Sequence, residues 1–154
     1  MILGAAAILV ILLDQLSKYL VAGHFLLNFS TPLLGRILYL TYIKNSGIAF
    51  GFAPRAGVFL IILTAAVIIV FIFVAANYSK KETAGRKLAL QIAAGLVLGG
   101  SIGNLIDRIR LGAVIDFIDF KFWPVFNFAD SAVTIGILII LVEILIKRVP
   151  TDSV

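Results

Sequence analysis

The sequence predicts a membrane protein of the all-α class, with four transmembrane helices and a small extracytoplasmic β region. Of the 154 residues, 62% are hydrophobic and only 14% are charged, against roughly 25% charged residues in soluble proteins. Apolar stretches recur at the length of roughly 20 residues that a helix needs to cross a bilayer. They predict a single membrane domain over residues 1–154, with helices at about 2–22, 56–78, 88–107 and 129–148 and a β region at about 25–55.

The first predicted helix contains Asp14 and Lys18, two charges that a cleavable signal peptide would not carry. It also lacks a basic N-terminal region and a clear small-x-small cleavage site, so we expect it to be retained. The two charges are spaced i, i+4 on one helix face, which favours an ion pair that lowers the cost of both near lipid. The same pair could also help to hold a site together.

The β region is indicated by the stretch RILYLTYIKNSG, residues 36–47, in which β-branched and aromatic residues precede a turn signal. Pro32, Gly35 and Pro54 punctuate the region. Gly47 and Gly51 flank the residues IAF at 48–50, where the backbone of this segment could approach another group closely. We therefore expect a small β element on the extracytoplasmic side.

The third predicted helix carries Gly95, Gly99 and Gly103 at intervals of four. Such a stripe of small residues lets a neighbouring helix pack tightly. Asn104, Asp107 and Arg108 follow at the outer end of the helix, where the guanidinium of Arg108 could bind backbone carbonyls or a carboxylate. Taken singly, each of the three is an ordinary residue for a helix end.

Two aspartates, Asp116 and Asp130, lie beside or inside apolar sequence. A carboxylate near lipid costs several kcal/mol unless it is paired, hydrated or protonated, so each is a hypothesis about function. Two carboxyls on one side of a membrane could share a proton and activate a water molecule at neutral pH.

Asp130 also has an ordinary structural explanation. Asn127 can cap the fourth helix, and Asp130 then lies in the first helical turn, where negative charge is favoured. Capping and catalysis both remain open for Asp130. The same position favours its ionised form, which makes Asp130 the more acidic member of any pair.

Asp116 is surrounded by β-branched and aromatic residues in the segment Val114–Ile118. An apolar setting raises the pKa of a carboxyl group, as required of the member that keeps the proton. Asp119, three residues further on, is the rival candidate. We prefer Asp116, because 14 residues separate it from Asp130, enough to return the chain to the membrane surface.

The orientation in the membrane follows from the density of positive charge. The loop Ser79–Lys87 contains Lys80, Lys81, Arg86 and Lys87 and is predicted to be cytoplasmic. With an even number of helices, both termini then lie in the cytoplasm. Most acidic residues fall toward the outer face, so the chemistry is expected there.

Composition also excludes several classes of site. The chain has no cysteine, which rules out disulfides and thiolate chemistry, and its single histidine, His24, makes a multi-histidine metal site implausible. We expect no metal and no cofactor. The net charge of +5 requires no nucleic acid, since basic residues at helix ends meet membrane lipids.

Five blocks of the sequence, taken together, resemble the lipoprotein signal peptidases, also called signal peptidase II, a family of bacterial aspartic proteases of the inner membrane. The blocks span nearly the whole chain. They are DQLSK at 14–18, NSGIAFG at 45–51, GGSIGNLIDR at 99–108, GAVIDF at 112–117 and FNFADS at 126–131.

The resemblance implies that Asp116 and Asp130 form a catalytic dyad. It implies that further motif positions bind substrate or shape the site: Asp14, Lys18, Asn45, Gly47, Gly100, Asn104, Arg108, Asn127 and Ala129. The implied substrate is a prolipoprotein whose cysteine carries diacylglycerol, cut on the N-terminal side of that cysteine. The implied inhibitor is the antibiotic globomycin, and we expect a monomer.

The family's fold has four transmembrane helices, an extracytoplasmic β-cradle and a short helix between the third and fourth spans. In this chain that last connection, residues 119–127, is short and contains Pro124. The expected mechanism has one aspartate ionised and one protonated, with a water molecule between them that attacks the scissile carbonyl.

Two other classes of function compete with a peptidase. A small proton-coupled transporter would use intramembrane carboxylates as a relay, but would need them distributed along a path through the bilayer. A non-catalytic assembly factor could be built on the glycine stripe, although that stripe also suits packing within one chain.

Overall fold

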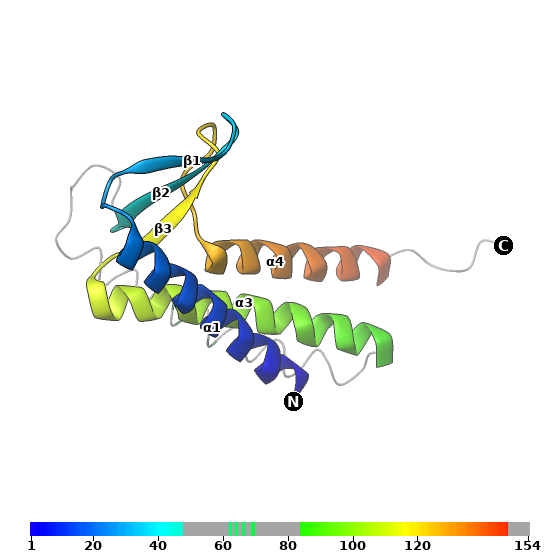
Figure 1. The fold of residues 1–154 in the computed structure, drawn as a ribbon. Helices are drawn as coiled ribbons and strands as arrows, with labels where there is room; N and C mark the ends of the chain where they lie inside the picture. Colours follow the sequence, from blue (N-terminus) through cyan, green and yellow to red (C-terminus); the bar gives the residue numbers. More distant parts are fainter. Residues whose placement is uncertain (48–61, 63, 65, 67–68, 70–83, 148–154) are drawn as a thin grey trace.

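Figure 1 shows the fold in a computed structural model, which describes residues 1–47, 62, 64, 66, 69 and 84–147. The described part contains three long helices and one small antiparallel sheet. Its elements are α1 (Ile2–His24), β1 (Ser30–Leu34), β2 (Leu38–Asn45), α3 (Ala84–Leu111), β3 (Val114–Asp119) and α4 (Phe128–Lys147).

The three helices α1, α3 and α4 are each long and apolar enough to cross a membrane. They match three of the four predicted spans, and many of the large apolar side chains on α1 and α4 are exposed at the surface of the bundle, where lipid would lie. The predicted span at 56–78 lies outside the described residues, except that Ile62, Thr64, Ala66 and Ile69 are each helical.

Helix α3 is longer than predicted at both ends. It ends at Leu111 because Gly112 adopts a left-handed conformation, with φ of +70°, and donates its N–H to the carbonyl of Arg108 at 3.0 Å. A glycine in this conformation after the last helical residue is a common way to satisfy free carbonyls at a helix end.

Glycines bring α3 into close contact with both neighbouring helices. A Cβ atom at Gly99 would lie 2.6 Å from the carbonyl oxygen of Ala7 on α1, so no larger residue fits there without movement. Gly100 faces the other side, where a Cβ would collide with the carbonyl oxygen of Ala129 on α4. The stripe is thus used for packing within the chain, which removes the main argument for an assembly factor.

The strands form one sheet in the order β1–β2–β3, with both pairs antiparallel. The pairing of β2 with β3 shifts register between Leu40 and Ile43, so the ladder is irregular at that point. The first two strands lie in the predicted β region, whereas β3 was not predicted as a strand.

The connection between α3 and α4 corrects one expectation. The resemblance implied a short helix there, but residues 112–127, all of them described, contain β3 and no helix. After β3 the chain folds back, and Phe126 pairs with Ile118 through hydrogen bonds of 2.7 and 3.0 Å. A segment held to a sheet edge in this way cannot also form a helix.

The sheet lies at the end of the bundle where α1 and α3 finish and α4 begins, while the start of α1 and the end of α4 point away from it (Figure 1). This arrangement gathers residues from distant parts of the sequence at one end of the helices.

Candidate active site

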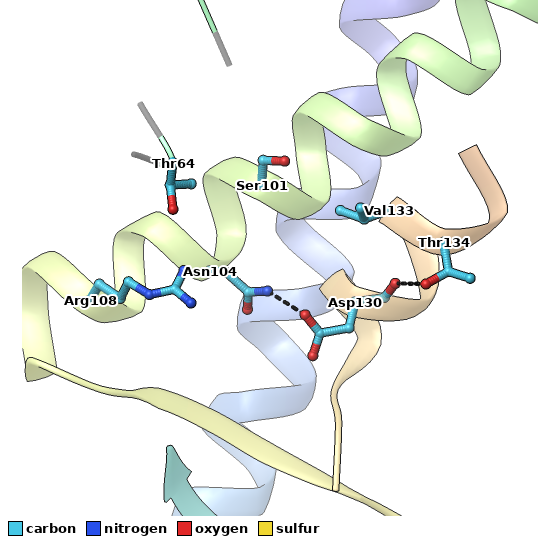
Figure 2. Close-up of a pocket in the computed structure, with 7 residues that line it drawn as sticks. All are labelled: Thr64, Ser101, Asn104, Arg108, Asp130, Val133 and Thr134. Atoms are coloured by element: carbon cyan, nitrogen blue, oxygen red, sulfur yellow. Dashed lines mark hydrogen bonds between the residues drawn. The ribbon is translucent and has the colours of Figure 1, made fainter. Parts of the chain in front are cut away.

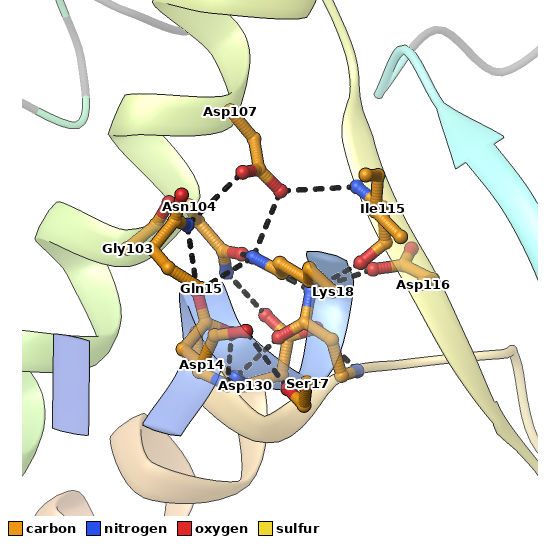
Figure 3. Close-up of polar contacts among 12 residues, drawn as sticks. Asp14, Gln15, Ser17, Lys18, Gly103, Asn104, Asp107, Ile115, Asp116 and Asp130 are labelled. Atoms are coloured by element: carbon orange, nitrogen blue, oxygen red, sulfur yellow. Dashed lines mark hydrogen bonds and ion pairs between the residues drawn. The ribbon is translucent and has the colours of Figure 1, made fainter. Parts of the chain in front are cut away.

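Four elements supply the polar side chains at the sheet end of the bundle. Figure 3 shows Asp14 and Lys18 from α1, Asn104 and Asp107 from α3, and Asp116 from β3, close to Asp130 in the first turn of α4. The sequence-predicted residues on these elements are therefore brought together. What each of them could do follows from its contacts.

Asp116 projects from β3 and is only 2% exposed. Its two carboxyl oxygens accept hydrogen bonds from side-chain amides, Oδ1 from Asn127 at 2.7 Å and Oδ2 from Asn45 at 2.9 Å. Burial raises the pKa of Asp116 to about 6, and the nearby charge of Asp130 adds to this effect, while the two amide donors oppose it. A carboxyl group in this environment can hold a proton near neutral pH.

Asp130 lies in the first turn of α4 and is half-buried. Its Oδ1 accepts a hydrogen bond from Nδ2 of Asn104 at 2.7 Å, and its Oδ2 accepts the backbone N–H of Asn127 at 3.2 Å. The backbone N–H of Asp130 in turn donates to Oδ1 of Asn127 at 2.9 Å. The predicted cap is confirmed, and its reciprocal form also ties down the carboxylate.

A cavity of about 370 Å³ opens beside Asp130 (Figure 2). Its walls come from α3, α4 and Thr64, and it is lined by Thr64, Ser101, Asn104, Arg108, Asp130, Val133 and Thr134. The guanidinium of Arg108 makes no hydrogen bond or ion pair with the described residues, so it is available to a group that enters the cavity. Asp130 is thus the carboxyl that lines the cavity, whereas Asp116 is buried and is not among the lining residues.

A buried lysine supports this site from α1. Nζ of Lys18 lies 2.9 Å from Oδ2 of Asp14, 2.9 Å from Oδ2 of Asp107 and 2.8 Å from Oδ1 of Asn104, which uses its three protons. The predicted pair of Asp14 and Lys18 is confirmed. Asp14 also accepts the backbone N–H of Ala129 at 3.0 Å, so α1 helps to cap α4.

Sequence reasoning did not select two residues of this network, Asp107 and Gln15. Asp107 accepts the backbone N–H of Ile115 at 3.1 Å, which joins α3 to β3, and Nε2 of Gln15 donates to Asp107 at 3.1 Å. A signal was present, because Asp107 follows Gly103 by four residues and so lies on the face of α3 that packs against α1.

Asn45 and Gly47 lie at the end of β2. Oδ1 of Asn45 accepts the N–H of Gly47 at 2.9 Å, and Gly47 has φ of +69°, a conformation that favours glycine. This contact turns the amide nitrogen of Asn45 toward Asp116. Gly51 lies outside the described residues.

Asp119, the rival of Asp116, is engaged elsewhere in the sheet. Burial would raise its pKa, but hydrogen bonds from Lys121 and Thr41 outweigh burial and lower it. The ammonium of Lys121 lies 2.7 Å from Oδ2, and Oγ1 of Thr41 donates to the same oxygen at 2.5 Å. Since residues three apart on a strand point to opposite faces, Asp119 does not share the surroundings of Asp116.

Among the residues that the structure describes, no group of three or more His, Cys, Asp or Glu side chains is arranged to hold a metal ion. The side chains that do meet are carboxyls, carboxamides and a lysine. Such a set can place a proton on one carboxyl, keep another ionised and position a water molecule between them.

Fold and site together define a small integral membrane protein with a cluster of acidic side chains at one end of its helices. Over residues 6–146 the chain matches the family model for signal peptidase II. It therefore belongs to the signal peptidase II family, whose members are bacterial membrane proteases.

Relatives and solved structures agree with this assignment. The chain is 43% identical to the lipoprotein signal peptidase of Halothermothrix orenii, with 84% of this chain and 85% of the relative covered. It is 42% identical to that of Moorella thermoacetica, covering 91% and 90%. Two structures described as a bacterial membrane enzyme match with TM-scores of 0.80 and 0.81, at 30% and 31% identity, over 97% of this chain and 92% of each. None of these comparisons supports a transporter.

Proposed function

We propose that this chain is an aspartic endopeptidase that removes signal peptides from prolipoproteins by cutting before the diacylglyceryl-modified cysteine. Its membership in the signal peptidase II family and its similarity to lipoprotein signal peptidases support a role in the processing of prolipoproteins. The observation that carries the catalytic type is the pair of Asp116 and Asp130, close enough for the charge of one to raise the pKa of the other.

Asp116 and Asp130 are given different roles by their surroundings. Asp130 lines the cavity from the first turn of α4, where an entering peptide and a water molecule can reach it, so we assign it the role of the base that deprotonates the attacking water. Asp116 is buried and holds the proton, with which it hydrogen-bonds the developing oxyanion. Asp130 then passes the proton that it took from water to the amide nitrogen, the C–N bond breaks, and Asp116 keeps its own proton.

The remaining residues hold these two carboxyls in position. Asn127 and Asn45 bind Asp116, Asn104 binds Asp130, and Lys18 with Asp14 supports Asn104 and the start of α4. Gly100 and Ala129 let α3 and α4 approach closely. Gly47 sets the direction of Asn45, and Arg108 lines the cavity in which the peptide is expected.

The proposed topology has four spans, both termini in the cytoplasm and the site at the outer surface of the bacterial inner membrane. Strand β2 ends beside the sheet end of the bundle, whereas α3 begins at the far end (Figure 1). The chain must therefore return across the bilayer between them, which supports a span at about 56–78. A site at this level lets diacylglyceryl chains stay among lipids while the peptide reaches the carboxyls.

The test is cleavage of a diacylglyceryl-modified prolipoprotein by the purified protein in detergent. Asp116→Asn and Asp130→Asn should each abolish cleavage, while the matched control Asp119→Asn should keep it. Full activity in either of the first two variants would overturn the dyad. Unmodified prolipoprotein should stay uncut, globomycin should block the reaction, and a single-chain molecular mass in detergent should accompany activity.

A further inference from the structure

The free end of the sheet carries a concentrated set of exposed apolar side chains. This end is formed by the β1–β2 turn and by the loop after β3. Ile37 is 64% exposed, Phe122 81% and Trp123 62%, and Leu33 and Leu34 beside them are also exposed. Exposed apolar clusters of this kind on a folded protein mark a contact with another apolar phase.

The loop with the two aromatic residues is held firmly by its neighbours. Lys121 has φ of +65° and donates its backbone N–H to Oδ1 of Asp119 at 2.7 Å. Its ammonium also donates to Oγ of Ser30 at 2.8 Å and lies 4.3 Å from the centre of the Tyr39 ring. These contacts join the loop to all three strands. Phe122 and Trp123 are therefore presented in a defined position.

The free end projects sideways from the bundle, at about the level along the helix axis at which α4 starts (Figure 1). A bilayer that surrounds the helices would therefore reach this end of the sheet. In the segment that joins α1 to β1, Leu26 and Phe29 are exposed as well, so the sheet carries exposed apolar side chains at its connection to the helices and at its free end. Arg36 adds a positive charge between Leu34 and Ile37 in the sequence, and the negative charge of Asp119 is balanced by its ion pair with Lys121.

We propose that the free end of the sheet docks into the lipid headgroup region. Phe122 and Trp123 would insert into the leaflet that surrounds the start of α4. Tryptophan and other amphipathic aromatic residues favour this region, and the positive charge of Arg36 suits anionic headgroups. Because β3 also carries Asp116, docking fixes the tilt of the sheet over the helix ends. The inference rests on membrane insertion alone and not on the proposed catalytic roles.

Trp123 provides the test, because it is the single tryptophan of the chain. The wild-type protein is reconstituted into phospholipid vesicles in which a share of the lipids is brominated in the upper part of the acyl chain. Trp123 fluorescence should lose most of its intensity to the brominated lipid and be little affected by iodide in the aqueous phase. Strong iodide quenching without quenching by the brominated lipid overturns the proposal.

Two further arms separate the lipid from other occupants. Quenching that declines as the protein-to-lipid ratio rises would assign the surface to a second copy of the chain, and quenching that needs added prolipoprotein would assign it to the substrate; either overturns the proposal. A matched control, Lys44→Trp in a Trp123→Phe background, moves the reporter to the opposite end of β2. It should be quenched less by the brominated lipid, and equal quenching at both ends also overturns the proposal.

Discussion

Asn127 and Asn104 are hydrogen-bonded to each other, Nδ2 of Asn127 to Oδ1 of Asn104 at 3.0 Å, and each binds one of the two candidate catalytic aspartates. The orientation of both amides follows from their other partners. Oδ1 of Asn127 accepts a hydrogen bond from the N–H of Asp130, and Oδ1 of Asn104 accepts a hydrogen bond from Nζ of Lys18. Each amide nitrogen must therefore point toward a carboxyl, so the two aspartates are linked through protein groups.

Asn127 has two separable tasks, capping α4 and donating to Asp116. We expect Asn127→Ala to lose both, at a cost of about 1 kcal/mol for the cap and on the order of 2- to 10-fold in kcat/KM for one hydrogen bond that positions the protonated Asp116. Asn127→Ser should recover the stability, because its hydroxyl can accept the N–H of Asp130, but not the activity. Thermal unfolding in detergent and cleavage kinetics measure the two effects. Wild-type kinetics in Asn127→Ser would show that the donor to Asp116 is unnecessary.

The pH dependence should report the protonation of Asp116. Its pKa is raised to about 6, and the proposed mechanism needs its protonated form, so kcat/KM of the free enzyme should fall as the pH rises through that value. Asn45→Ala removes a donor that favours the ionised form, which raises the pKa and moves this limb to higher pH. Stability should also depend on pH, because folding raises the pKa of Asp116. Its contribution to the free energy of unfolding is largest below its unfolded pKa and is lost as the pH rises through about 6.

The matched control for this profile is Asp119→Asn, which changes a carboxyl on the other face of β3. Its alkaline limb should coincide with that of the wild type. A limb that stays in place in Asn45→Ala but moves in Asp119→Asn would assign the titration to Asp119.

Removal of the buried lysine should be strongly destabilising. Lys18 is 2% exposed, and Lys18→Met leaves the carboxylates of Asp14 and Asp107 buried without their counter-ion. We expect a loss of about 3–5 kcal/mol in the free energy of unfolding. Lys121→Met breaks an ion pair on a lysine that is 45% exposed, for which at most about 1 kcal/mol is expected. Denaturant unfolding in one detergent compares the variants, and equal losses would mean that the Lys18 network adds little to stability.

Helix packing predicts opposite effects for two glycines of α3. Gly99→Ala places a Cβ 2.6 Å from the carbonyl oxygen of Ala7, so α1 must move, at about 1–3 kcal/mol. Gly85→Ala meets nothing within 4 Å and should be neutral or stabilise by up to about 1 kcal/mol, since alanine favours helix. The melting temperature in detergent should fall for the first variant and not for the second. A fall of similar size in both would show that the close contact at Gly99 is not the cause of its loss, because alanine is the better helix former at both positions.

Sequence reasoning placed the described helices to within a few residues, because a long run of apolar residues has a single stable form in lipid. It missed β3, because the six residues of Val114–Asp119, VIDFID, do not alternate apolar and polar side chains. It also left Asp107 aside, because one acid at a helix end has several explanations until its partners are known.

The sequence by itself determined that the chain is a membrane protein with polar residues gathered toward one face, since transfer into lipid depends on composition and on the length of each apolar run. The blocks around Asp116 and Asp130 also indicated the family. Only the tertiary structure decided which groups meet: that β3 completes the sheet, that Asp119 is paired with Lys121, and that Asn127 and Asn104 bind the two aspartates. Such contacts join residues far apart in the chain, and hydrogen bonds depend on distances that sequence spacing does not specify.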